Sequence, residues 1–158
     1  MITAEIICIA ILNLSIPNAN YACEQMEHVV NAAEDLSFEP ALLVSLIHYE
    51  SRWNPDVVSS GGACGLTQVI PRWTTPRKTC RQLLFAPTSI YEGAKMLRRW
   101  TDSFGRGSVN RGLCGYNAGY TCRRSTSRGW RYSRKIQRMF RRIQHEIENI
   151  QEFQEPGC

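Results

Sequence analysis

Glu50 is the residue of this sequence best placed for acid–base chemistry, because it closes the apolar run ALLVSLIHYE. Leu43, Leu46 and Ile47 precede it by seven, four and three residues, so on a helix all three share a face with the carboxylate. A carboxylate held against apolar groups is poorly solvated, which raises its pKa. The C-terminal end of a helix carries a partial negative charge, which also raises the pKa of a carboxyl group placed there. A raised pKa keeps the proton on near neutral pH, as a general acid requires.

The same position also fits a structural glutamate that binds a backbone amide or pairs with Arg52, and helix position alone does not decide between the two roles. The following residues favour a functional site. Asn54-Pro55 turns the chain after the helix, and the Ser-Ser-Gly-Gly sequence at 59–62 forms a loop whose backbone can approach a ligand closely.

Two later motifs add neutral hydrogen-bonding groups. The sequence GLTQ at 65–68 offers an amide, and GYNAG at 115–119 offers a phenol and a second amide. Trp53, Trp73 and Trp130 are aromatic groups that could stack on a sugar, with Trp73 the favoured candidate and a place in the core the alternative for each. An acid, neutral hydrogen-bonding groups and aromatic rings together indicate a carbohydrate site.

Helices must position these groups, since helical periodicity recurs and strand patterns are nearly absent. Four segments show an apolar stripe at helical spacing. The first begins at Met26, the second runs from Pro40 to Glu50, the third covers 90–100, and the fourth is a long amphipathic segment over 136–150. Pro40 suits the first turn of its helix. We therefore expect an all-α fold of one compact domain, a size that 158 residues suit.

The N-terminus differs from the rest of the chain. Ile6–Ile16 is an apolar run too short to span a bilayer, and we interpret residues 1–22 as a signal peptide cleaved near Ala22, followed by a catalytic domain at 23–158. A buried or membrane-anchoring N-terminal helix is the alternative. Export predicts a periplasmic or cell-wall-associated protein.

Cysteine usage agrees with an oxidising compartment. One of the seven cysteines, Cys8, lies in the predicted signal, and the other six make an even number for three disulfides. Short loops and joined termini suggest the pairs Cys23–Cys158, Cys64–Cys80 and Cys114–Cys122. The alternatives are a zinc site, which no CxxC pair supports, and lipidation of Cys23, for which the preceding residues are a poor match.

The charge is unevenly distributed. Between Arg72 and Arg142 lie 18 of the 19 Lys and Arg residues, and only Glu92 and Asp102 are acidic there. This concentration of positive charge favours a polyanionic partner, and it fits nucleic acid, anionic lipid and cell-wall polymer equally. The alternative is a solvated surface with Arg stems covering apolar groups. No nucleic-acid recognition motif is present, and export argues against that partner.

The motifs in their order and spacing resemble the lytic transglycosylase domain related to soluble lytic transglycosylase and goose-type lysozyme. The matching elements are Glu50-Ser51, Asn54-Pro55, Ser60, the 65–68 motif with Pro71, and the 115–119 motif, and the likeness covers roughly residues 26–145. The small size, signal and cysteines resemble the specialised members that accompany secretion, conjugation or pilus machines.

The resemblance implies a lysozyme-like helical domain with a substrate cleft, acting as a monomer without cofactor or metal on the glycan strands of peptidoglycan. The implied reaction is non-hydrolytic cleavage of the β-1,4 bond between N-acetylmuramic acid and N-acetylglucosamine. In it, Glu50 protonates the leaving oxygen and then acts as the base on the muramoyl C6 hydroxyl, which closes a 1,6-anhydro ring.

The resemblance also assigns roles to single residues. Gln68 would bind substrate near the scissile bond, Ser60 would line the cleft, and Ser51 would shape the site rather than react. Thr67 stands where the family often has a methionine that floors a sugar subsite, so the resemblance makes Thr67 a possible subsite residue, smaller and more polar than that methionine.

The pair Tyr116 and Asn117 matches the family's Tyr-Asn pair, whose phenol is expected near the catalytic glutamate. A packed core aromatic is the alternative for Tyr116. Gly115 precedes this pair where alanine is common. His48 lies about 200° around the helix from Glu50, and we interpret it as structural.

Conventional glycosidases use two carboxyl groups, about 5–5.5 Å apart when retaining and about 6.5–9.5 Å apart when inverting. Asp56 is the one nearby candidate for a second carboxyl group, and we interpret it as a turn residue. The same glutamate would also serve a muramidase that admits water. A third hypothesis is a largely non-catalytic factor that binds the wall or assists assembly.

Overall fold

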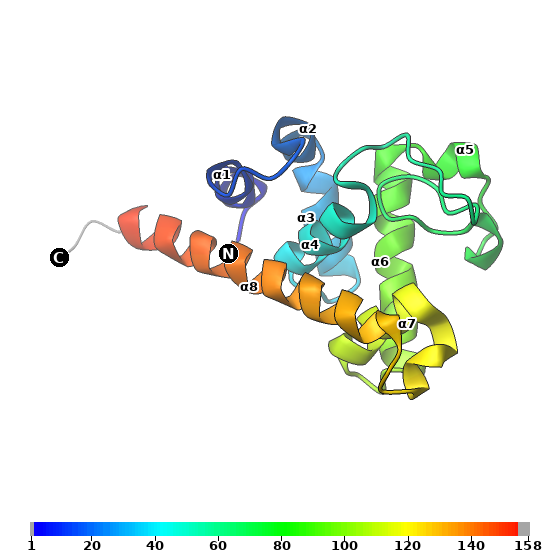
Figure 1. Ribbon diagram of the computed structural model, residues 1–158. Coiled ribbons are helices and arrows are strands. Elements are labelled where there is room, and N and C mark those ends of the chain that lie inside the picture. Colours follow the sequence, from blue (N-terminus) through cyan, green and yellow to red (C-terminus); the bar gives the residue numbers. More distant parts are fainter. Residues whose placement is uncertain (1, 155–158) are drawn as a thin grey trace.

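The computed structural model describes residues 2–154 and confirms an all-α fold, whose helices are drawn in Figure 1. Two isolated β-bridges, Val58 with Cys64 and Cys64 with Val69, tie together the long loop after the fourth helix. In chain order the elements are α1 (Ala4–Asn13), α2 (Ala19–Glu24), α3 (Met26–Asp35), α4 (Pro40–Ser51), the 3-10 helix η1 (Pro71–Trp73), α5 (Cys80–Leu83), α6 (Ala86–Ser103), α7 (Val109–Ala118), the 3-10 helix η2 (Gly119–Arg123) and α8 (Arg128–Gln154).

The helix ends follow local chemistry. Pro40 occupies the first turn of α4, where its missing N–H leaves no bond unmade. Thr79 and Gln82 form a reciprocal capping box at the start of α5. Ser108 accepts a hydrogen bond from a backbone N–H of the first turn of α7. These caps fix where the elements around the long loop begin.

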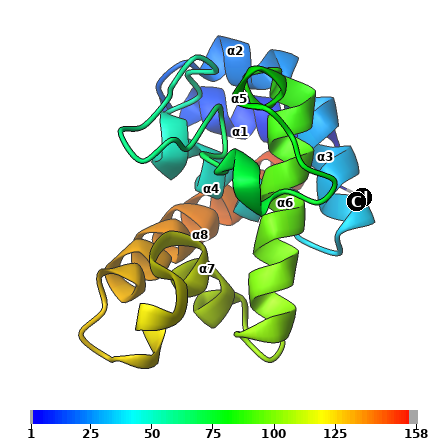
Figure 2. The same cartoon turned by 90° about the vertical axis from the view of Figure 1, so that its right-hand side faces the viewer.

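Helix α4 lies at the centre of the molecule, packed against α3 and α8, while α6 contacts α3, α5 and α7. Figure 2 shows α7 close to the start of α8 and to the far end of α6. Leu46 and Ile47 of α4 are completely buried, as are Leu97 of α6 and Ile136 of α8. The glutamate at the end of α4 therefore sits where several helices converge.

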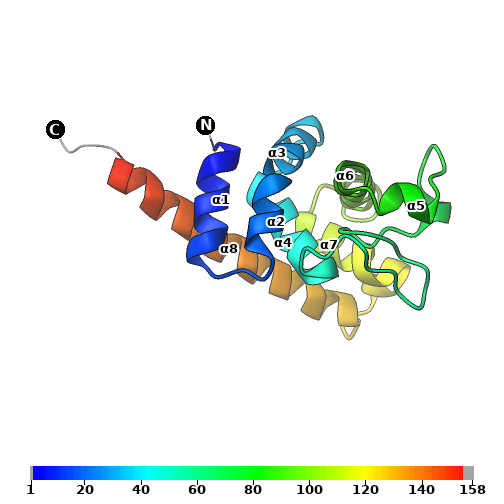
Figure 3. The same ribbon diagram turned by 90° about the horizontal axis from the view of Figure 1, so that it is seen from above.

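The first two helices form a hairpin that packs on the rest of the fold. Helix α1 lies against α8, as the view from above in Figure 3 shows. Ile7 and Ile11 of α1 are completely buried, and the Asn13 amide donates a 2.8 Å hydrogen bond to Glu146 of α8. A disulfide between Cys8 and Cys23 joins α1 to α2.

The Cys8–Cys23 bond shows that the predicted Cys23–Cys158 pair is wrong. Helices α1 and α8 pack on each other, and Cys158 lies outside the described residues. In the described chain the Cys23 sulfur is bonded to Cys8. Removal of residues 1–22 as a signal peptide stays a prediction.

The other two predicted disulfides, Cys64–Cys80 and Cys114–Cys122, are confirmed. Cys64–Cys80 fastens the long loop to the start of α5, and Cys114–Cys122 fastens α7 to η2. With these four sulfurs bonded to each other, they do not serve as zinc ligands. Within residues 2–154, every helix is too short or too polar to cross a membrane.

Candidate active site

Glu50 lies in the last turn of α4, and the phenol of Tyr132 from α8 donates a hydrogen bond to its Oε1. Burial raises the pKa of Glu50 to about 7, although the hydrogen bond from Tyr132 acts in the opposite direction. Near neutral pH a large fraction of Glu50 therefore carries a proton. Because Oε1 accepts from Tyr132, the other oxygen is the one free to hold and deliver that proton.

Tyr132 was missed by the sequence interpretation, which had placed the phenol of Tyr116 near the acid. Tyr132 lies 82 residues after Glu50, on the buried face of α8 four residues before Ile136. Burial raises the pKa of Tyr132 well above its usual value, and the charge of Glu50 adds to this. Tyr132 therefore stays a hydrogen-bond donor. Its place in the apolar stripe of the last helix was the available signal.

Tyr116 of α7 has a different partner. Its hydroxyl donates a 2.6 Å hydrogen bond to the carbonyl of Thr67. Burial raises the pKa of Tyr116 well above its usual value, and the charge of Glu50 is the second cause, so the two groups are near each other. Tyr116 thus ties α7 to the long loop beside the acid instead of binding the acid itself.

A strained turn ends the helix that carries Glu50. Arg52 and Trp53 adopt φ values of 52° and 63°, and left-handed backbone costs roughly 1–2 kcal/mol for each non-glycine residue. Trp53 is buried, and the amide of Asn18 in the N-terminal hairpin donates a 2.8 Å hydrogen bond to the Arg52 carbonyl. The hairpin and the core thus hold the turn in place.

Ser51 is buried, and its hydroxyl donates to the Ile47 carbonyl at 3.3 Å within α4. This placement fits the supporting role expected of it.

Gln68 lines the cleft and braces the loop at the same time. Its Nε2 donates to the carbonyls of Val57 at 3.0 Å and Gly65 at 2.9 Å, which uses both N–H bonds and leaves the amide oxygen free to accept. Gly65 is required here: its φ is 76°, and a Cβ would lie 2.0 Å from the Leu83 carbonyl oxygen.

Thr67 does not contribute to a sugar subsite, since its side chain is 1% exposed and points toward α6. Its hydroxyl donates to the Ser89 carbonyl at 2.7 Å, and a Cβ added to Gly93 would lie 2.4 Å from the Thr67 Cβ. The glycine at position 93 therefore allows the loop to pack closely on α6. Ser60 and Asn117 are exposed, and neither lines the cleft described next.

A cleft of about 390 Å³ opens between the long loop, α6 and α7. Trp73, predicted as a subsite residue, lines this cleft and is 53% exposed, and the Arg72 guanidinium lies 4.9 Å from the centroid of its ring. Glu50 is not among the residues that line this cleft, whereas Tyr116 lines it and has its pKa raised by burial and by the charge of Glu50. The lining comprises Gln68, Val69, Ile70, Trp73, Met96, Arg99, Trp100, Ser103, Gly115, Tyr116, Gly119 and Tyr120.

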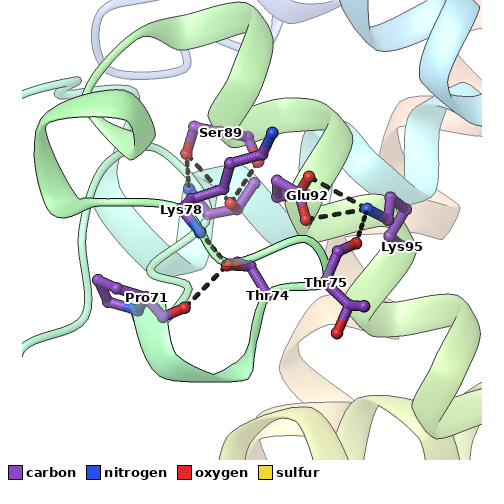
Figure 4. Close-up of polar contacts among 8 residues, drawn as sticks. Pro71, Thr74, Thr75, Lys78, Ser89, Glu92 and Lys95 are labelled. Atoms are coloured by element: carbon purple, nitrogen blue, oxygen red, sulfur yellow. Dashed lines mark hydrogen bonds and ion pairs between the residues drawn. The ribbon is translucent and has the colours of Figure 1, made fainter.

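The segment that carries Trp73 is anchored to α6, as Figure 4 shows. The Lys95 ammonium donates to the Thr75 carbonyl at 2.9 Å and pairs with the Glu92 carboxylate at 3.1 Å. The Thr74 hydroxyl donates to the Pro71 carbonyl at 2.8 Å. Glu92 is buried and paired, so it has a structural role and is not a second catalytic acid.

Asp56 also has a role in the turn. Its backbone N–H donates to Asn54 Oδ1 at 3.0 Å. Its charge contributes to raising the pKa of Tyr21, whereas it is not among the groups that shift the pKa of Glu50. Within residues 2–154, the site thus has one desolvated carboxyl group.

A helical domain with one desolvated acid beside an aromatic cleft is what this fold and site define. The chain belongs to the transglycosylase SLT domain family, whose model matches residues 27–139. The predicted family is therefore confirmed.

Among individual relatives, the transglycosylase of Enterobacteria phage PRD1 is 32% identical over 99 residues, which cover 62% of this chain and 36% of that protein. The 70 kDa soluble lytic transglycosylase of Escherichia coli shares the fold, with a TM-score of 0.70 and 17% identity over 88% of this chain and 29% of its own. An inactive mutant of the lytic transglycosylase Slt from Pseudomonas aeruginosa also shares the fold, with a TM-score of 0.60 and 17% identity over 95% of this chain and 30% of the Slt chain. The chain thus spans about a third of the length of these relatives.

Proposed function

We propose that this protein is a peptidoglycan lytic transglycosylase that cleaves the β-1,4 bond between N-acetylmuramic acid and N-acetylglucosamine. The observation that carries the proposal is a single carboxyl group, Glu50, whose pKa is raised to about 7 and whose Oε1 is held by Tyr132. Family membership and the aromatic cleft beside the acid support the same reaction.

One carboxyl group suffices for both halves of the reaction. Protonated Glu50 gives its proton to the glycosidic oxygen as the bond from that oxygen to the muramoyl C1 breaks. The resulting carboxylate then takes the proton of the muramoyl C6 hydroxyl, whose oxygen bonds to C1 and forms the 1,6-anhydro ring. Glu50 ends protonated, as it began. Tyr132 holds the carboxyl group in one orientation through both steps.

A muramidase is the alternative, in which water instead of the C6 hydroxyl attacks C1 and leaves a reducing end. The structure supplies no second carboxyl group beside Glu50 within the described residues, so activation of that water would also fall to Glu50. A largely non-catalytic wall-binding factor is the third candidate, and the raised pKa of Glu50 argues against it.

The decisive experiment incubates the oxidised protein with purified peptidoglycan and analyses the products by mass spectrometry, with Glu50→Gln as control. Muropeptides with 1,6-anhydromuramoyl ends, absent from the variant, are the expected result. Reducing ends would identify a muramidase. Absence of cleavage by both proteins would favour the wall-binding factor.

We also propose that the protein is exported, acts on the wall outside the cytoplasm as a monomer, and opens local gaps. Such gaps would serve a secretion, conjugation or pilus apparatus. One relative belongs to a phage, so passage of a virus is a further use that such a gap could have. Detection of the protein in periplasmic fractions of its host would test the location.

A further inference from the structure

We propose that Arg99 makes the cleft a site for a saccharide that bears a carboxylate, and that it distinguishes muramoyl-containing strands from neutral chitin-like glycans. This inference rests on the proposed function and specifies the substrate of the same cleft. The carboxylate can come from the lactyl group of the muramoyl residue or from a stem peptide attached to it, and the chemistry recognised is the same.

Arg99 is the one charged side chain that lines the cleft within the described residues. It lies on α6 between Met96 and Ser103, three residues after the first and four before the second, so all three share the helix face that borders the cleft.

No carboxylate of the described chain lies within 4 Å of Arg99. The two acids of α6 pair with other cations, Glu92 with Lys95 and Asp102 with Arg98. Arg99 thus lines the cleft with no protein carboxylate of the described residues within 4 Å to neutralise it.

Aromatic rings line the side of the cleft formed by α6 and η2. The centroid of Trp100 lies 5.9 Å from that of Phe104 and 5.2 Å from that of Tyr120, in edge-to-face arrangements. Trp100 needs the space beside Gly115, where a Cβ would lie 2.5 Å from the Trp100 ring. Tyr120 is 64% exposed. This wall suits the apolar face of a pyranose ring.

A neutral sugar needs only such rings and neutral hydrogen-bonding groups, so a cation in the cleft indicates an additional, anionic group on the ligand. A guanidinium binds a carboxylate through two parallel hydrogen bonds, which fixes orientation as well as charge. In peptidoglycan the muramoyl residue bears the lactyl ether, whereas N-acetylglucosamine has no carboxylate. Arg99 would therefore select the register in which a muramoyl residue occupies the cleft.

The test measures binding, without turnover, of Glu50→Gln and of Glu50→Gln combined with Arg99→Gln. Three glycans of equal length serve as probes: strands with stem peptides, strands stripped of peptides so that the lactyl carboxylate is free, and chito-oligosaccharides. We expect Arg99→Gln to weaken binding of the carboxylate-bearing glycans about 10-fold or more and to leave chito-oligosaccharide binding unchanged. Arg99→Lys, which keeps the charge without the planar fork, should give an intermediate loss.

Arg111→Gln is the matched control, because Arg111 is exposed on α7 and does not line the cleft. A loss confined to the stripped strands identifies the lactyl carboxylate, and a loss confined to the peptide-bearing strands identifies a peptide carboxylate. An equal loss on all three glycans, no loss on any, or no binding of Glu50→Gln to any glycan would overturn the inference. Product analysis of the wild-type chain tests the proposed reaction separately, so one can fail without the other.

Discussion

The two sides of the site differ in burial and in charge. On the side built by α4 and α8, Glu50 has one defined partner, Tyr132, and lies in a desolvated environment. On the side built by α6 and the 71–78 segment, Trp73 and Arg99 are exposed. The first side is suited to move a proton and the second to hold a chain of sugars. Under the proposed function, chemistry and recognition thus come from different elements.

This division predicts two kinds of variant. Changes on the α4–α8 side should alter kcat and its pH dependence, because they act on the acid. Changes on the α6 side should alter KM, because they remove contacts that the ground state and transition state share. A variant on one side with the kinetics of the other would break the comparison.

The largest effect is expected for Glu50→Gln. The amide keeps the shape and can accept from Tyr132, but it cannot deliver a proton, so kcat should fall by about 10²- to 10⁴-fold or more. Release of soluble muropeptides from purified peptidoglycan measures this. Retention of substantial turnover by a correctly folded variant would remove Glu50 from its role.

The same substitution should stabilise the protein at alkaline pH. Because the pKa of Glu50 is about 7 in the folded protein and 4.5 otherwise, ionisation disfavours the folded state increasingly as pH rises from 4.5 through 7. Above that window Glu50→Gln should be more stable than wild type by up to about 3 kcal/mol. Urea unfolding of both proteins at pH 8 and pH 4 checks this. The same difference in free energy of unfolding between variant and wild type at both pH values would contradict it.

Tyr132→Phe should lower kcat by about 10- to 100-fold, because the acid loses the bond that orients it. The hydrogen bond lowers the pKa of Glu50, so its removal should raise that pKa and move the alkaline limb of the kcat profile to higher pH. Tyr116→Phe is the matched control, since Tyr116 binds the Thr67 carbonyl and not the acid. A profile that shifts equally in both variants would refute a direct role for Tyr132.

Trp73→Ala should have the smallest effect. Loss of one exposed ring on the rim of the cleft should raise KM about 10-fold with little change in kcat. Phe85→Ala removes a comparably exposed ring outside the cleft and should change neither constant. A fall in kcat for Trp73→Ala would place the ring on the chemical side of the site.

The sequence was informative where the signal is local. The apolar stripe ending at Glu50 predicted both α4 and the raised pKa of its acid. The helices around Met26, Trp100 and Ile136 followed from their periodicity. Trp73 was selected as a ring for the cleft, and the structure places it there.

Other features depend on contacts between distant segments and were missed. Tyr132 binds Glu50 across 82 residues, and the residues next to Tyr132 in the sequence do not indicate this partner. Thr67 was expected in a subsite because of the motif that contains it, but packing against Gly93 turns it inward. Cys8 was assigned to a segment expected to be removed, so its bond to Cys23 was not considered.

The pairing of the first helix with the last has a consequence for synthesis of the chain. Tyr132 lies on α8, and α8 also packs against α1, with Asn13 bound to Glu146 across 133 residues. A nascent chain that has released α4 but not yet α8 has Glu50 without its partner. Because 82 residues separate Glu50 from Tyr132 in the sequence, the pair can assemble only after the start of α8 has been synthesised.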